Sequence, residues 1–149
     1  MSAIARKLAT DSVTIQNDVA RGDLLDESLT QTDLVALVLR AATPSSAGGL
    51  GFRLLLTAIN SDHGPDPPGS IHGHKEGFAV DVGTIDGSDV GANSATLGFC
   101  LAMGQHNQWV TKIGLGGDAR AWLAQVTAAC PDTVVFADND QPHIHLQSQ

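Results

Sequence analysis

Residues 72–81 read HGHKEGFAVD and combine metal-binding side chains with a strand-like pattern. The segment Phe78–Val82 alternates in character and contains β-branched valines, which favours an extended strand over a helix. Gly77 allows the chain to turn directly before this strand. We therefore expect His74, on the loop, and Asp81, on the strand, to face one point.

A second stretch, residues 142–146, reads PHIHL. Alternate residues of a strand point to the same face, so His143 and His145 are expected on one side. Two imidazoles and one carboxylate leave a fourth position for water or substrate, which characterises a catalytic zinc rather than a structural one. We therefore expect His74, Asp81 and His145 to bind Zn²⁺.

The turn before this second stretch carries Asp138 and Asp140, which are expected to support the ligands from a second layer of contacts. Further upstream, residues 60–73 are rich in Pro, Gly, Asp and His. Such a long polar segment is too broken for regular structure, and loops of this length are usually functional. We expect this loop to shape access to the site.

The rest of the chain alternates between helix and strand patterns. Strands are expected at 13–15, 52–59, 78–82, 109–115, 133–137 and 143–146, and helices at about 30–43, 94–105 and 118–130, the last capped by Asp118. Strands that follow one another without a helix favour a mixed or antiparallel sheet over a parallel one. The predicted fold is therefore α+β, a small mixed or antiparallel sheet flanked by helices. Residues 1–45 are expected to form an arm and helix packed on the same domain as the core, 46–149.

Composition excludes several classes of partner. The 149 residues carry a net charge of −8 without any cluster of Lys or Arg, which argues against nucleic acids and anionic membranes. No apolar run reaches the ~18 residues of a membrane span. The first ten residues have no apolar signal core, so synthesis in the cytoplasm without a signal peptide is expected. Cys100 and Cys130 are expected to be buried reduced thiols, with a disulfide as the alternative.

These motifs resemble those of a known family. His74-Lys75-Glu76-Gly77-Phe78-Ala79-Val80-Asp81 is similar to the H-x-x-G-x-A-x-D signature of zinc D-Ala-D-Ala carboxypeptidases and related phage endolysins, which share a fold with the Hedgehog signalling domain. Pro142-His143-Ile144-His145 resembles the H-x-H that closes the site in one branch of this family. The resemblance covers roughly residues 50–147.

The resemblance implies a Hedgehog/DD-peptidase-like fold with zinc on His74, Asp81 and His145. It places His143 near the reacting carbonyl, where the side chain would assist proton transfer or stabilise the oxyanion. Zinc lowers the pKa of a bound water toward ~7 and polarises a carbonyl, which suits hydrolysis of an amide. The implied substrate is a stem or cross-link peptide of peptidoglycan, met after release to the cell wall or on a phage particle.

The chain departs from the family pattern at three places. One branch has a glutamate three residues before the last ligand, where this chain has Pro142. The serine usually found two residues before the first ligand is His72, and the arginine expected after the entering strand has no clear equivalent. A cation at the reacting carbonyl would have to be His63, His72 or His143. We take His63, His72 and Trp109 as candidates for the substrate pocket.

Two alternative hypotheses also assign a bound metal to this chain. One is a catalytically weak or inactive zinc-bound structural or recognition module, such as a phage virion component, which the acidic charge and the missing Glu and Arg favour. The other is a non-haem iron oxygenase, because two His and one carboxylate also describe its facial triad. Those enzymes usually begin with H-x-D or H-x-E, whereas His74 and Asp81 are seven positions apart here. The spacing therefore disfavours iron.

Overall fold

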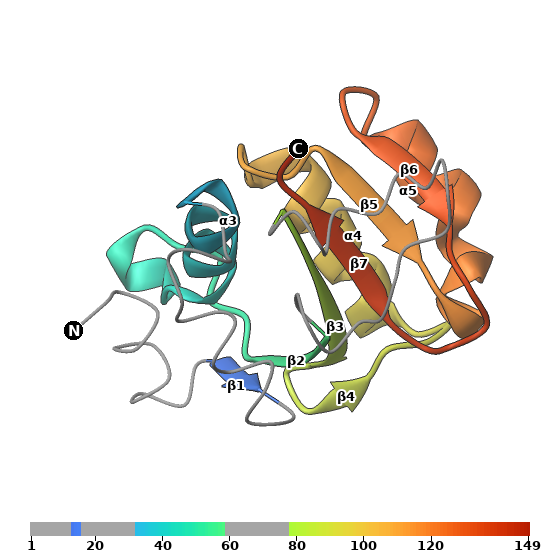
Figure 1. The fold of residues 1–149 in the computed structure, drawn as a ribbon, viewed down its shortest axis with the longest axis horizontal. Coiled ribbons are helices and arrows are strands. Elements are labelled where there is room, and N and C mark those ends of the chain that lie inside the picture. Colours follow the sequence, from blue (N-terminus) through green and yellow to red (C-terminus); the bar gives the residue numbers. More distant parts are fainter. Residues whose placement is uncertain (1–12, 16–31, 59–77) are drawn as a thin grey trace.

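The structure is a computed structural model that describes residues 13–15, 32–58 and 78–149. Helices are interspersed with runs of consecutive strands along this part of the chain, as the sequence predicts (Figure 1). The elements are β1 (Val13–Ile15), α3 (Thr32–Ala42), the 3₁₀ turn η1 (Ser45–Ala47), β2 (Leu54–Ala58), β3 (Ala79–Ile85), β4 (Ser88–Asp89), α4 (Ser94–His106), β5 (Lys112–Leu115), η2 (Gly117–Trp122), α5 (Leu123–Ala129), β6 (Val134–Ala137) and β7 (Ile144–Gln147).

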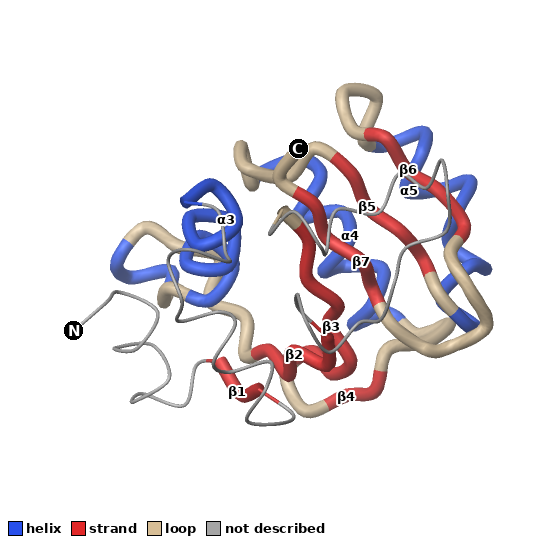
Figure 2. The backbone as a smooth tube through the Cα atoms, viewed as in Figure 1, coloured by secondary structure: helices blue, strands red, loops and turns tan. Residues whose placement is uncertain are grey.

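The strands form one mixed sheet in the order β1-β2-β3-β7-β5-β6, with β4 paired to β3 (Figure 2). The β2–β3, β3–β7 and β5–β7 pairs are antiparallel, whereas β1–β2 and β5–β6 are parallel. The predicted α+β class and mixed sheet are therefore confirmed. The last two strands, β6 and β7, follow each other in sequence, yet β5 lies between them, because α5 returns the chain so that β6 runs parallel to β5.

Helix α3 is amphipathic and joins the same core as the sheet. Its residues Leu34, Leu37, Val38 and Ala41 recur at helical spacing and are at most 1% exposed. They belong to one apolar cluster with Leu56 and other strand residues. The helix ends at Ala42, as expected from the proline at position 44.

Helices α4 and α5 lie on one face of β5 and β7 (Figure 1). The first turn of α4 is capped by Asn93, whose side chain accepts a hydrogen bond of 2.9 Å from the backbone N–H of Thr96. Phe99 and Met103 bring this helix into the apolar cluster, where both are fully buried. Helix α4 thereby packs its apolar side chains into the same core as the sheet.

The expectation that Asp118 caps a helix is wrong. Residues 117–122 form the 3₁₀ turn η2, Gly116 occupies its N-cap without a side-chain hydrogen bond, and α5 starts only at Leu123. The turn already begins at Gly117, so Asp118 lies inside it and not at the capping position. Another segment approaches Gly117 closely: a Cβ there would lie 2.9 Å from the Cα of Pro142. Gly117 also has a φ of +55°, which glycine adopts without strain.

Both cysteines are free thiols and both are buried, which confirms the predicted reduced state. Burial, followed by the proximity of Cys130, raises the pKa of the Cys100 thiol to about 12. Burial also raises the pKa of Cys130. Across the described ranges, none of the helices has both the length and the apolar character needed to cross a membrane.

Candidate functional site

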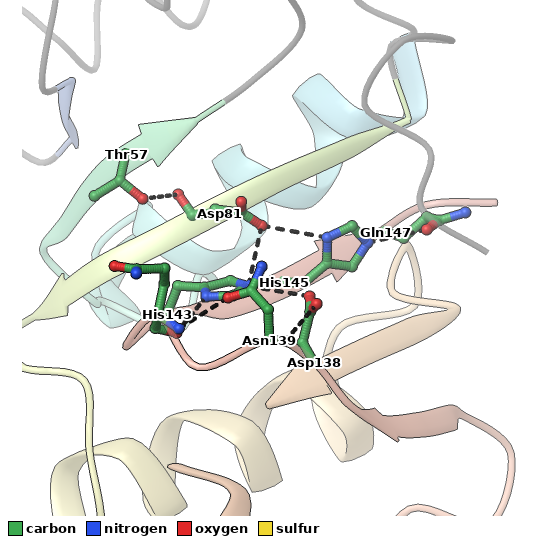
Figure 3. A network of polar contacts seen from close by, with 8 residues as sticks. Thr57, Asp81, Asp138, Asn139, His143, His145 and Gln147 are labelled. Atoms are coloured by element: carbon green, nitrogen blue, oxygen red, sulfur yellow. Dashed lines mark hydrogen bonds and ion pairs between the residues drawn. The ribbon is translucent and has the colours of Figure 1, made fainter. Parts of the chain in front are cut away.

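Asp81 and His145 lie opposite each other on the adjacent strands β3 and β7 (Figure 3). They are paired residues of the antiparallel register, although 64 positions separate them in the sequence. The Nδ1 atom of His145 is 3.2 Å from the Oδ1 atom of Asp81. Asp81 is 6% exposed and His145 is fully buried, so the pair is held away from bulk water. The sheet therefore brings together two of the three expected metal ligands.

The orientation of His145 is fixed by its other ring nitrogen. Nε2 is 3.0 Å from the Oε1 atom of Gln147, whose amide nitrogen donates to the backbone carbonyl of Gln149. The amide oxygen can only accept, so Nε2 of His145 carries a proton and donates it. The other ring nitrogen, Nδ1, faces the carboxylate of Asp81, so the two nitrogens of His145 point at two different oxygen atoms.

Nδ1 of His145 and Oδ1 of Asp81 lie within hydrogen-bonding distance, an arrangement that a proton or a metal ion between the two atoms stabilises. With zinc–nitrogen and zinc–oxygen bonds of about 2.0–2.1 Å, two ligand atoms of a tetrahedral site lie roughly 3.3 Å apart. The observed separation of 3.2 Å between His145 Nδ1 and Asp81 Oδ1 is compatible with that spacing, and it is equally the distance of a direct hydrogen bond. Nitrogen and carboxylate oxygen are also donor types that zinc prefers. These two residues therefore fit as part of a zinc site.

His143, just before β7, is the third member of this cluster. Its Nε2 atom is 3.0 Å from Oδ2 of Asp138 and 3.9 Å from Oδ1 of Asp81, and its Nδ1 atom is 2.7 Å from the carbonyl oxygen of Gln141. Both ring nitrogens therefore face oxygen acceptors. A neutral imidazole has only one N–H, so both contacts are satisfied only by the protonated ring.

The electrostatic surroundings of His143 agree with this geometry. Burial lowers its pKa, but the hydrogen bond with Asp138, the charge of Asp81 and the Gln141 carbonyl together outweigh burial. The net effect is that the pKa of His143 is raised above its usual value. The site thus contains a buried cationic side chain next to a candidate ligand.

Two glycines of the β5 region make room for the histidine rings. A Cβ on Gly116 would lie 2.4 Å from Nδ1 of His143, and one on Gly114 would lie 3.0 Å from the Cβ of His145. Gly114 is the residue of β5 that pairs with His145, and the ring of Phe136 packs against that imidazole with centroids 5.6 Å apart. Small residues at these positions are therefore a condition for the observed ring placement.

The two turn aspartates behave differently. Asp138 contacts His143, as expected, and its side chain is 5% exposed. Asp140 instead forms a 2.9 Å ion pair with Arg120, and its side chain is 89% exposed. The expectation that Asp140 supports the ligands is therefore wrong, because its carboxylate faces solvent and a surface cation.

The remaining candidates are not joined to this cluster by described contacts. His74, the expected first ligand, and the pocket candidates His63 and His72 lie outside the described residues. Trp109 lies in the loop between α4 and β5, half-buried against the core, with its backbone N–H donating to the side chain of Asn107. Within 13–15, 32–58 and 78–149, no three His, Cys, Asp or Glu side chains form a group that could hold a metal.

Sequence reasoning missed Gln147 and the two glycines. A glutamine two residues after a histidine is a weak signal alone, and only its position on the same strand face as His145 suggests a contact. Gly114 lies in β5 and Gly116 directly follows the strand, and glycines at such positions indicate close approach of neighbouring groups. Compared with known proteins, the chain matches no family model, no curated protein and no solved structure.

Proposed function

We propose that this protein is a zinc-dependent peptidase of the Hedgehog/DD-peptidase fold that hydrolyses an amide bond in peptidoglycan stem or cross-link peptides. The observation that carries the proposal is the 3.2 Å contact between the paired residues Asp81 and His145, with the His143 ring on the same carboxylate. It joins the two sequence motifs that resemble the family. His74 would complete the set of three ligands.

The described residues suggest a division of roles. When bound, zinc would supply Lewis-acid chemistry at neutral pH, by lowering the pKa of a water and polarising the substrate carbonyl. Asp81 and His145 would fix the position of that charge, because they belong to hydrogen-bonded central strands. Their burial would exclude bulk water, which strengthens electrostatic interactions at the site.

His143 would supply the positive charge for which the family commonly uses arginine. Asp138 and the Gln141 carbonyl hold its ring in one orientation and hold protons on both nitrogens. A buried cation close to the scissile carbonyl stabilises the negative charge that develops on its oxygen. The proton at Nε2 of His143 would also be available to the leaving amine.

The test is incubation of the zinc-loaded protein with purified peptidoglycan and measurement of newly freed amino groups. The wild-type chain should release them, and Asp81→Ala should abolish both release and zinc retention. His143→Ala should retain zinc but release amino groups at least tenfold more slowly. His106→Ala is the matched control, because His106 is an exposed histidine at the end of α4.

Two outcomes would overturn parts of this proposal. Retention of zinc without any release of amino groups would exclude the peptidase and favour a zinc-bound recognition module. Full turnover by His143→Ala would show that this side chain does not serve the reaction.

A further inference from the structure

Gln147 is a buried amide held rigidly beside the proposed metal ligand. It is 4% exposed and belongs to the central strand β7, where it pairs with Ala79 on one side and Lys112 on the other. Its carbonyl also accepts hydrogen bonds of 2.8 and 3.1 Å from the backbone and hydroxyl of Thr111. The backbone of Gln147 therefore has little freedom to move relative to His145.

The side-chain amide is oriented as firmly as the backbone. Its nitrogen donates to the carbonyl of Gln149, which also accepts a 3.0 Å hydrogen bond from Nζ of Lys112. Because the nitrogen is used in this way, the oxygen is the atom that faces Nε2 of His145, at 3.0 Å. Gln147 thus offers the imidazole an acceptor and no donor.

We propose that Gln147 is a positioning residue of the metal centre, which keeps the proton of His145 on Nε2 and directs Nδ1 toward Asp81 to bind a divalent cation. This inference rests on the proposed function and adds a residue to it. Metal-binding histidines usually donate their second N–H to an oxygen acceptor, which orients the ring and increases its basicity. Here an amide on the same strand would serve as that acceptor.

The first experiment measures zinc affinity by competition with a chromophoric chelator. Gln147→Met removes the acceptor at nearly constant volume, and we expect about 10- to 100-fold weaker zinc binding with an unchanged circular dichroism spectrum. Gln147→Glu restores an oxygen acceptor and should bind zinc more tightly than Gln147→Met. Gln125→Met is the matched control, because Gln125 is exposed on α5, and its affinity should equal that of the wild type.

The second experiment determines which ring nitrogen of His145 carries the proton. Long-range ¹H–¹⁵N NMR spectra of His145 should show a protonated Nε2 both with and without zinc, and a zinc-induced shift at Nδ1. Loss of the Nε2 proton on zinc binding, or equal zinc affinity of Gln147→Met and the wild type, would overturn the role of Gln147. If the wild-type chain binds no zinc, the proposed function itself is wrong. If the wild type binds zinc and Gln147→Met binds it equally well, only the role of Gln147 is wrong.

Discussion

Gly116→Ala tests whether the site depends on the close approach of β5 to the segment before β7. The backbone of Gly116 is extended, with φ −100° and ψ 156°, so alanine adopts it without strain. The added Cβ would nevertheless lie 2.4 Å from both the carbonyl oxygen of Gln141 and Nδ1 of His143. Gly116 also donates a 2.9 Å hydrogen bond to the His143 carbonyl, so the two segments cannot separate freely.

Contacts this short force the neighbouring backbone to shift. Inserting a methyl group into a closely packed region typically costs about 1–3 kcal/mol. For a chain of this size, each kcal/mol lowers Tm by roughly 2–4 °C. We therefore expect Gly116→Ala to unfold about 2–12 °C below the wild type, and its NMR spectra to show a displaced His143 ring and a changed contact with Asp138.

Gly98→Ala is the matched control for this substitution. Gly98 is exposed on α4, and a Cβ there would meet nothing within 4 Å. Alanine should stabilise the helix by about 0.5–1 kcal/mol. The reasoning is refuted if Gly116→Ala melts at the wild-type temperature with unchanged His143 resonances.

Three further predictions follow from described contacts. Asp138→Ala removes the acceptor at Nε2 of His143. It should slow amide hydrolysis at least tenfold, while zinc affinity stays within about twofold. Unchanged turnover would contradict a role of the Asp138–His143 contact in the reaction. The pKa of Cys100 is raised to about 12 in the folded chain, whereas an unfolded thiol titrates near 8.5–9. The free energy of unfolding should therefore fall above pH 9, by about 1 kcal/mol per pH unit. Urea unfolding at pH 8 and 10 should show a smaller loss in Cys100→Ala than in the wild type, and equal losses would refute this prediction. Asn93→Ala removes the acceptor for the Thr96 N–H and should cost about 1 kcal/mol in urea unfolding, while a wild-type midpoint would show that this cap is dispensable.

Local patterns in the sequence predict most of the element types. Helix α3 follows from its apolar spacing and from the proline after it, and β2 follows from a short apolar run. The turn between β3 and β4 carries a signal that the prediction did not use. Asp86 and Gly87 have φ values of 51° and 81°, as the two central residues of a type I′ hairpin do, and Asp-Gly is a preferred pair there.

The order of strands could not be read from local patterns. Pairing of β5 between β6 and β7 is a long-range choice, decided by how α5 and the following segment pack. The approach of Asp81 to His145 was expected from their chemistry, but their register depends on the whole β3–β7 pair. Gln147 was missed because a lone polar residue gains meaning only once its neighbours in space are known.

The placement of β5 between β6 and β7 has a consequence for the short segment 138–143, which must step across the end of β5. Backbone hydrogen bonds from Gly116, Gly117 and Asp138 tie this bridge to the strand end at 2.8–2.9 Å. Within the bridge, the carboxylate of Asp138 and the carbonyl of Gln141 set the direction of the His143 imidazole. Its length is therefore under tighter constraint than that of an ordinary surface connection. We therefore expect the insertion or deletion of one amino acid there to displace the His143 ring from Asp138.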